Sequence, residues 1–303
     1  MLFDIRWPLA SGVPIVMLPG WDARAVLRAV ERHRVTHLHL VPAMFGWLLD
    51  LPVDERAAFD LSSLRVIVHG AAPCPIPVKR AMIDWLGPIL LEYYGASETG
   101  TGIQIDSTDW LAHPGSVGRR PTPDGVVIRN DDGRDLPDGE TGRIWIRIDP
   151  ATRFSYFNAP DKTAGQYAGD YATLGDVGHY DADGYLFLTG RTAECIISGG
   201  VNIYPREVDE ALLDHPAVAD ACVVGVPSRE WGEEVKAVVQ LRPDTPPSAE
   251  LACELIAHAR ARIAAFKCPR SVDFVTELPR SPAGKIARQT VRAPYWAGLD
   301  SEI

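Results

Sequence analysis

The chain has 303 residues, 46% of them hydrophobic and 23% charged, which is typical of a soluble globular protein. Its length predicts about two domains, and no segment has the roughly 20 consecutive apolar residues that a membrane-spanning helix needs. A net charge of −10 disfavours binding to nucleic acid or to an anionic membrane. The five cysteines lack C-x-x-C spacing and the N-terminus lacks a secretory signal, so we expect reduced thiols in a cytoplasmic protein.

Residues 22–100 alternate helix and strand patterns, which predicts a parallel α/β sheet, and an apolar segment precedes them. The chain opens on the apolar segment Leu9–Gly20, in which Val13–Leu18 is expected to be a buried strand; a strand so early indicates that upstream structure is missing. A helix capped by Asp22 follows, with Val26, Leu27 and Val30 on one face. The next expected elements are the strands Val35–Val41 and Leu64–His69, the helix Val78–Leu86 and the strand Ile89–Tyr94. Ligands bind beyond the carboxyl ends of such strands, where loops 70–73 and 95–100 lie.

Two other patterns follow toward the C-terminus. Short strands separated by turns predict an antiparallel, barrel-like section, with Val126–Arg129, Arg143–Ile148 and Tyr185–Leu188 as the strands. A smaller α+β pattern then begins with two strands that flank Gly199 and Gly200. It continues with a helix from Pro205, the strands Ala221–Val226 and Val235–Leu241, and a helix capped by Ser248. The predicted fold is therefore α/β, with part of a large domain over residues 1–190 and a small, mobile α+β domain over residues 191–303.

Four short motifs carry the functional signal, and each is weak by itself. They are Tyr94–Gly100 (YGASETG), Leu174–Asp176 (LGD), Gly190–Arg191 followed by Ile197–Pro205 (ISGGVNIYP), and Pro282–Ile286 (PAGKI). In this order and spacing the chain resembles the AMP-forming acyl-CoA synthetases of the adenylate-forming superfamily. The resemblance extends over essentially the whole chain. It implies an acid–thiol ligase in which a carboxylate attacks the α-phosphate of ATP, pyrophosphate leaves, and the CoA thiol then displaces AMP.

The resemblance implies roles for the first motif and for the loop before it. Glu98 would be catalytic by holding Mg²⁺, which favours a carboxylate together with phosphate oxygens, and Ser97 would offer a hydroxyl to phosphate. Tyr94 would stack on adenine beside Gly95. The narrow backbone of three small residues would let the base approach closely; these are Gly70, Ala71 and Ala72. Each role has a purely structural alternative: Glu98 could be a solvated loop glutamate, Tyr94 a core tyrosine, and the three small residues an ordinary turn.

The remaining implied site residues lie in the second half of the chain. Asp176 would accept both ribose hydroxyls, Arg191 would contact ribose or phosphate, and Asn202 would make a further ATP contact. Lys285 would be the catalytic lysine that neutralises charge during adenylation and then leaves the site. Gly199 and Gly200 would lie against the pantetheine arm of CoA. Ala193 would be the hinge of the small domain. Each role has a purely structural alternative. Asp176 could be an ordinary acid in a turn, Arg191 a surface arginine and Lys285 a solvent-facing loop lysine. The two glycines could form an ordinary hairpin turn.

The sequence departs from the family pattern in two ways. The hinge position is Ala193, where relatives have Asp or Lys; a hinge needs only to absorb backbone rotation, so we expect rotation with altered kinetics. No Ser/Thr/Gly-rich loop ending in Pro-Lys-Gly is present, although in the family such a loop binds the β- and γ-phosphates. We therefore expect the isolated chain to adenylate poorly, and a separate chain could supply the missing N-terminal part.

The expected substrates are ATP, CoA and a small carboxylate, with Mg²⁺ as the metal ion. The motif residues 111–119 and the form of the glycine loop favour a fatty or other hydrophobic carboxylate. Three alternatives remain open: an amino-acid adenylation domain, an oxidative luciferase relative, and a non-catalytic or complementing fragment that binds nucleotide or CoA. Titration with AMP and an acyl-adenylate analogue would separate the binding interpretations.

Overall fold

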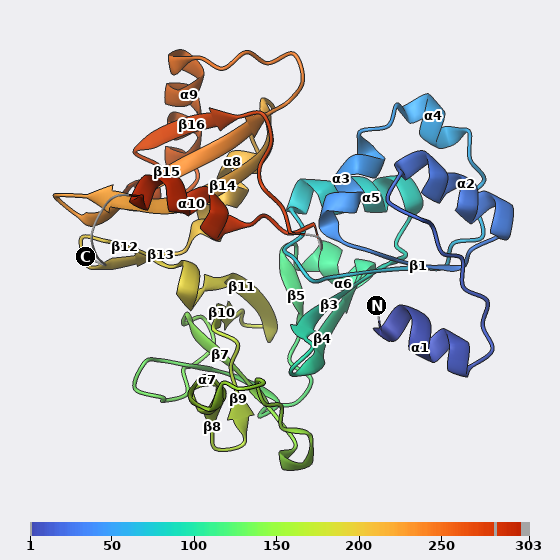
Figure 1. The fold of residues 1–303 in the computed structure, drawn as a ribbon, viewed down its shortest axis with the longest axis horizontal. Coiled ribbons are helices and arrows are strands. Elements are labelled where there is room, and N and C mark those ends of the chain that lie inside the picture. The colour runs from blue at the N-terminus through green and yellow to red at the C-terminus, as the bar shows by residue number, and fades with distance from the viewer. Residues whose placement is uncertain (1, 282–283, 298–303) are drawn as a thin grey trace. The chain divides into compact units, whose positions relative to one another are not determined.

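The structure is a computed structural model that describes residues 2–281 and 284–297. The chain divides into two compact units, residues 1–119 and residues 120–303. No helix within the described ranges is long and apolar enough to cross a membrane. Figure 1 shows the elements in chain order, and each unit is described separately below.

The first unit contains a four-stranded sheet with the order β1-β2-β3-β4. Strands β1, β2 and β3 pair in parallel, whereas β4 runs antiparallel to β3 (Figure 1). The strands of this unit are β1 (His37–Leu40), β2 (Val66–His69), β3 (Leu90–Ala96), β4 (Gly100–Asp106) and β5 (Ser116–Arg119). Its helices are α1 (Leu2–Ala10), α2 (Ala23–His33), α3 (Pro42–Leu49), α4 (Val53–Ala57), α5 (Ile76–Leu86) and α6 (Ser107–Ala112). The predicted parallel α/β arrangement is thus confirmed, with one antiparallel strand added.

Helix α2 forms as its sequence predicts. The Asp22 carboxylate accepts a hydrogen bond from the Ala25 amide at 2.6 Å and so caps the helix. Val26, Leu27 and Val30 are buried on one face.

The expectation for the first segment is wrong. Residues 2–10 form α1, and Val13–Leu18 is an irregular, largely exposed segment rather than a buried strand. A strand needs a neighbour for its backbone hydrogen bonds, and within the described residues this segment pairs with no strand.

The second unit begins with an antiparallel sheet in which the strands follow the order β11-β10-β7-β9-β8, with β6 also paired to β7. Its elements are β6 (Val126–Arg129), β7 (Gly142–Arg147), α7 (Pro160–Ala164), β8 (Tyr167–Ala168), β9 (Tyr171–Ala172), β10 (Asp176–Tyr180) and β11 (Tyr185–Arg191). The predicted antiparallel section is confirmed. Over the described residues the strand order does not return on itself, so this sheet is open and not a closed barrel.

A separate five-stranded sheet follows, with the order β13-β12-β15-β14 and with β16 parallel to β15. Its elements are β12 (Ile196–Ser198), β13 (Val201–Ile203), α8 (Pro205–Leu213), β14 (Val218–Ser228), β15 (Gly232–Leu241), α9 (Ala249–Arg260), β16 (Ser271–Val275) and α10 (Arg288–Trp296). The small α+β fold is thus confirmed. A domain boundary at residues 190 and 191 falls between the two sheets of this unit and stays a prediction.

Both faces of this second sheet are covered. Val208 and Leu212 of α8 and Leu255 of α9 pack on one face, against a cluster that includes Val223. Val291 of α10 packs on the other face, against a cluster that includes Val224. Because side chains alternate along a strand, neighbouring residues of β14 enter two different cores.

Candidate functional site

The first group of predicted site residues lies at the carboxyl ends of β2 and β3. These strands are parallel neighbours, with His69 opposite Glu92, so the loop after β2 lies beside the end of β3. Gly70 is buried there, and a Cβ atom at this position would lie 2.7 Å from the Tyr93 carbonyl oxygen. Ala71 has a φ of 68°, in the left-handed region that disfavours alanine. The loop therefore has a constrained backbone at its first two residues.

The first motif, Tyr94–Gly100, is a β-hairpin rather than a loop. Strand β3 continues through Tyr94 and Gly95 to Ala96, and β4 begins at Gly100. Tyr94 lies opposite Ile103, and the register shifts between Tyr94 and Gly95. Ser97 and Glu98 are in the turn, where Ser97 is exposed and Glu98 is half-buried. The hairpin thus presents a carboxylate and a hydroxyl at one tight turn.

In the second unit, Asp176 and Arg191 form an ion pair. They begin β10 and end β11, where the antiparallel register places them opposite each other. Arg191 Nε donates to Asp176 Oδ1 at 2.7 Å; the Asp176 side chain is 13% exposed and that of Arg191 is 52% exposed. A nearly buried carboxylate is therefore held by a cation that still reaches solvent.

The charges of Asp176 and Arg191 affect the pKa of the Lys285 amine. Burial lowers the pKa of the Lys285 amine, Arg191 lowers it further, and Asp176 opposes both effects. Its backbone is held by a hydrogen bond from the Ser281 amide to the Lys285 carbonyl at 2.8 Å. Arg280 Nη1 also donates to the Gly284 carbonyl at 2.7 Å. The neighbouring motif residues, Pro282 and Ala283, lie outside the described residues.

Gly199 and Gly200 form the turn between β12 and β13. Their φ angles are 58° and 79°, which glycine adopts readily. A Cβ atom at Gly199 would lie 2.6 Å from the Trp231 ring, and the Gly199 amide donates to the Trp231 carbonyl at 2.8 Å. A glycine is therefore required at this turn on structural grounds. Asn202 lies opposite Ile197 in the same hairpin and is exposed.

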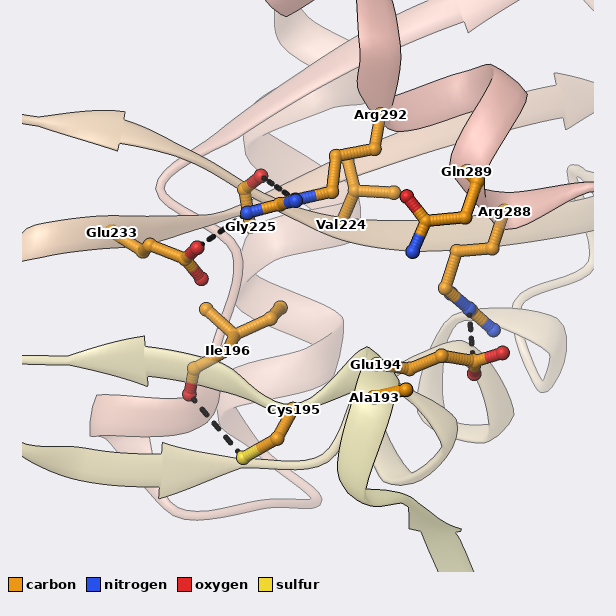
Figure 2. Close-up of a pocket in the computed structure, with 10 residues that line it drawn as sticks. All are labelled: Ala193, Glu194, Cys195, Ile196, Val224, Gly225, Glu233, Arg288, Gln289 and Arg292. Atoms are coloured by element: carbon orange, nitrogen blue, oxygen red, sulfur yellow. Dashed lines mark hydrogen bonds and ion pairs between the residues drawn. The ribbon is translucent and has the colours of Figure 1, made fainter. Parts of the chain in front are cut away.

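Ala193 lies in a short 3-10 turn, Thr192–Glu194, directly after Arg191 and is exposed. It also lines a cavity of about 60 Å³, shown in Figure 2. Among the other lining residues are two arginines of α10, Arg288 and Arg292, and two glutamates, Glu194 and Glu233. None of the sequence motifs contains these charged residues; the signal for the arginines was their spacing of four positions, which places both on one helix face.

The structure brings together two sets of predicted residues. One set, in the first unit, comprises the loop of Gly70, Ala71 and Ala72 and the hairpin that carries Tyr94 and Glu98. The other set, in the second unit, comprises Asp176, Arg191 and Lys285. Gly199, Gly200 and Asn202 lie together in the β12–β13 hairpin.

Comparison with protein families supports the resemblance read from the motifs. Residues 1–153 match the model described as AMP-binding enzyme, and residues 207–285 match the model described as AMP-binding enzyme C-terminal domain. A medium/long-chain-fatty-acid–CoA ligase of Mycobacterium tuberculosis is 34% identical over 97% of this chain and 52% of its own length. An indoleacetate–CoA ligase of Aromatoleum aromaticum is 36% identical over 94% of this chain and 54% of its own. The chain thus spans about half the length of these curated relatives.

Solved structures give the same result. The amide bond synthetase McbA of Marinactinospora thermotolerans has a TM-score of 0.86 and 36% identity, covering 97% of this chain and 61% of that protein. The o-succinylbenzoate CoA synthetase of Bacillus subtilis, solved with its acyl-adenylate intermediate, has a TM-score of 0.79 and 29% identity. That match covers 98% of this chain and 58% of that protein. From its motifs, its fold and these matches, the chain belongs to the AMP-binding enzyme family of adenylate-forming proteins.

Proposed function

We propose that the chain takes part in AMP-forming ligation of a carboxylate to CoA, and that its substrate is a fatty or other hydrophobic acid. The observation that carries this proposal is the Asp176–Arg191 ion pair, in which Arg191 Nε donates to Asp176 Oδ1 at 2.7 Å; the charges of this pair act on the Lys285 amine. A lysine that responds to a nearly buried carboxylate and an exposed guanidinium suits a reaction in which negative charge develops on a phosphoryl group. The fatty-acid–CoA and indoleacetate–CoA ligases among the relatives support the hydrophobic acyl class.

Asp176, Arg191 and Lys285 have different roles, which follow from the charge of each side chain. Asp176 accepts hydrogen bonds from the ribose hydroxyls, because an ionised carboxylate is an acceptor only. Arg191 keeps that carboxylate in place, and its guanidinium contacts ribose or phosphate. Lys285 bonds the substrate carboxylate and the α-phosphate, and stabilises the charge that forms as pyrophosphate departs.

In the first unit, Tyr94 offers its ring to the adenine base beside the glycine-containing loop. Glu98 would hold Mg²⁺. One carboxylate on a tight turn fits this ion, since Mg²⁺ at nucleotide sites takes one or two carboxylates together with phosphate oxygens. When bound, the ion would neutralise phosphate charge.

Gly199, Gly200 and Ala193 serve the second half-reaction. The glycine turn is assigned to the pantetheine arm of CoA, and Ala193 absorbs the backbone rotation between the two half-reactions. If Ala193 is the pivot, Ala193→Asp changes the stopped-flow rates of the half-reactions. Identical rates in the two proteins would contradict this assignment.

Calorimetric titration with AMP and with an acyl-sulfamoyl-adenosine tests the nucleotide site. We expect the chain to bind both, and Asp176→Asn to weaken binding by roughly 10- to 100-fold, as loss of a charged hydrogen bond predicts. Asp183→Asn, an exposed acid in the following turn, is the matched control and should bind normally. Absence of binding by the unmodified chain would contradict the proposal.

We expect residues 1–303 alone to release pyrophosphate slowly from ATP and Mg²⁺ with a panel of fatty, aromatic and amino acids. They contain no Ser/Thr/Gly-rich phosphate loop, so donors for the departing pyrophosphate are few. Turnover in the ordinary enzyme range of about 1 to 1,000 s⁻¹ would overturn this expectation. Addition of a polypeptide that supplies such a loop should restore the rate.

A second candidate acceptor is an amine. It rests on the similarity to the amide bond synthetase, whose match is as extensive as those of the CoA ligases. Supplying the chain with a synthetic acyl-adenylate and either CoA or an amine distinguishes the two. Thioester formation supports the CoA proposal, whereas amide formation alone replaces it.

A further inference from the structure

The loop that carries Lys285 is closed by contacts between its own backbone groups. Arg280 and Ile286 form an antiparallel β-bridge at its two ends. Inside this bridge the Ser281 amide donates to the Lys285 carbonyl at 2.8 Å, and the Gly284 amide donates to the Ser281 carbonyl at 2.8 Å. Lys285 itself is exposed. Because its side chain is not enclosed by packing, the direction in which this side chain leaves the loop depends on the backbone.

The peptide group between Gly284 and Lys285 sets this direction. Gly284 has a φ of 77°, and the conformational freedom of glycine leaves the following peptide free to rotate unless another group holds it. Arg280 Nη1 donates to the Gly284 carbonyl at 2.7 Å. That carbonyl belongs to the same planar peptide group as the Lys285 amide. The Arg280 guanidinium therefore fixes the peptide from which Lys285 projects.

The same guanidinium is anchored to β14 through Asp220. Arg280 Nη2 donates to Asp220 Oδ2, and the other carboxylate oxygen accepts a hydrogen bond from the Ala221 amide at 2.9 Å. The side chains of Asp220 and Arg280 are 18% and 28% exposed, so this charge-assisted pair is largely shielded from water. The register of β14 shifts between Val218 and Asp220, and such an irregularity redirects the side chains near it.

The two ends of the loop are held independently of the Arg280 side chain. Leu278 is buried, and its amide donates to Gln240 Oε1 of β15 at 3.2 Å. The Ala287 amide donates to the Pro279 carbonyl at 2.8 Å. Loss of the Arg280 side chain should therefore release the tip of the loop while the sheet stays folded.

We propose that Arg280 and Asp220 are positioning residues for Lys285. Asp220 holds the guanidinium, the guanidinium holds the Gly284 carbonyl, and the fixed peptide directs the Lys285 side chain. A lysine that acts by the placement of its charge needs such support, because a displaced charge stabilises the transition state less. The proposal rests on the role proposed above for Lys285, but the contacts themselves are present in the chain without substrates.

A double variant that conserves the net charge tests the positioning role. Arg280→Met/Asp220→Asn removes one positive and one negative charge, so a change in the pKa of the Lys285 amine reports a change in its position. NMR titration of the lysine-labelled chain measures this pKa; the chain has five lysines, and Lys285→Arg assigns the signal. We expect the pKa to rise, because the surroundings of the amine lower it on balance and their effect weakens when the amine moves away.

Two controls separate positioning from a general loss of an ion pair. Asp220→Asn alone keeps Arg280 and an oxygen that accepts its hydrogen bond, so the pKa of the lysine should not rise. Arg262→Met/Asp214→Asn is the matched double variant in the same unit, because Arg262 is paired with Asp214 and also donates to a backbone carbonyl, that of His258, at 3.2 Å. A rise in either control, or no rise in Arg280→Met/Asp220→Asn, would overturn the proposal.

Amide hydrogen exchange provides a second measurement. In Arg280→Met/Asp220→Asn we expect exchange at the Ser281 and Gly284 amides to accelerate at least about tenfold, because both donate inside the loop that has lost its anchor. Amides of β15 should exchange at unchanged rates. Unchanged exchange at Gly284, or equal acceleration in β15, would contradict a local positioning role. Neither measurement involves ATP or CoA, so failure of this proposal is distinguishable from failure of the proposed activity.

Discussion

Lys79 and Glu92 form a buried ion pair, with Lys79 Nζ 2.5 Å from Glu92 Oε2 and side chains 0% and 7% exposed. The ammonium group also lies 4.7 Å from the centre of the Trp110 ring. The pair joins α5 to β3 two residues before Tyr94, so it supports the strand that carries the first motif. Burial lowers the pKa of Lys79, and the attraction of Glu92 opposes this shift.

We expect Lys79→Met to lower the free energy of unfolding of the first unit by about 3–5 kcal/mol, because the buried Glu92 carboxylate would lose the ammonium group that neutralises it. The double variant Lys79→Met/Glu92→Met removes both charges and should recover most of this loss. Urea denaturation, monitored by circular dichroism, measures the free energy of unfolding of the single and the double variant. Equal destabilisation of the single and double variants would show that the charge pairing is unimportant.

The Lys285 amine should respond in opposite directions to its two neighbours. Asp176→Asn removes the group that raises the pKa of Lys285, so the pKa should fall; Arg191→Gln removes a group that lowers it, so the pKa should rise. NMR titration of the labelled lysines measures both shifts, with Lys162 as an internal reference. Shifts of the same sign in both variants would place Lys285 outside the influence of this pair.

Thiol reactivity should follow burial. Cys253 is exposed, whereas Cys222 and Cys268 are buried, and burial raises the pKa of Cys222 to about 12. Because the thiolate is the reactive form, Cys253 should react first with a thiol reagent at pH 8, and Cys222 should react only after unfolding. The Cys253→Ser variant should lose the rapid phase. A rapid phase that persists in it would contradict the assignment.

Ala71 is predicted to be strained. A φ of 68° costs alanine about 1–2 kcal/mol, and glycine avoids this cost while losing about 0.5–1 kcal/mol in chain entropy. We therefore expect Ala71→Gly to stabilise the first unit by up to about 1 kcal/mol. Ala72→Gly, one position later, is the control and should destabilise it. Thermal unfolding that ranks the two variants in reverse would exclude backbone strain at Ala71.

Two helix caps should contribute similar free energies in different units. Asp22→Ala and Ser248→Ala each remove an acceptor for a first-turn amide, at Ala25 and Leu251, and each should cost about 1 kcal/mol. Asp22→Asn keeps an acceptor oxygen and should cost less. Chemical denaturation of the variants provides the comparison, and an equal loss in Asp22→Asn would show that charge rather than capping is responsible.

The sequence predicted the elements that depend on interactions between residues close together in the chain. The cap and apolar face of α2, the proline at the start of α8 and the glycine turn at Gly199 all appear in the structure where expected. Strand β10 was not predicted because it contains Gly178, which has low strand propensity. In the fold a glycine is needed there, since a Cβ atom would lie 2.3 Å from the Phe187 carbonyl.

The same difference between local and long-range interactions applies to the candidate site. The motifs indicated Asp176, Arg191 and Lys285 as separate candidates, but the proximity of these residues depends on strand register and on contacts between positions about 100 residues apart. Glu194 and Arg288 are 94 residues apart in sequence, and neither lies in a motif that indicates a contact. Strand β4 was missed for a related reason, because the glycines at its start resemble a loop until β3 provides its hydrogen-bonding partner.

The contacts that Asp209, Arg288 and Arg292 make with β14 have a consequence for association of the protein with itself. Among the described strands, β14 pairs with β15 alone, so its other side is an open edge. Along that edge the Val223 amide donates to Asp209, the Val223 carbonyl accepts from Arg288, and the Gly225 carbonyl accepts from Arg292 and Trp296. Side chains thus occupy the backbone groups that a strand from another molecule would need, and they protect this edge from intermolecular β-pairing and aggregation.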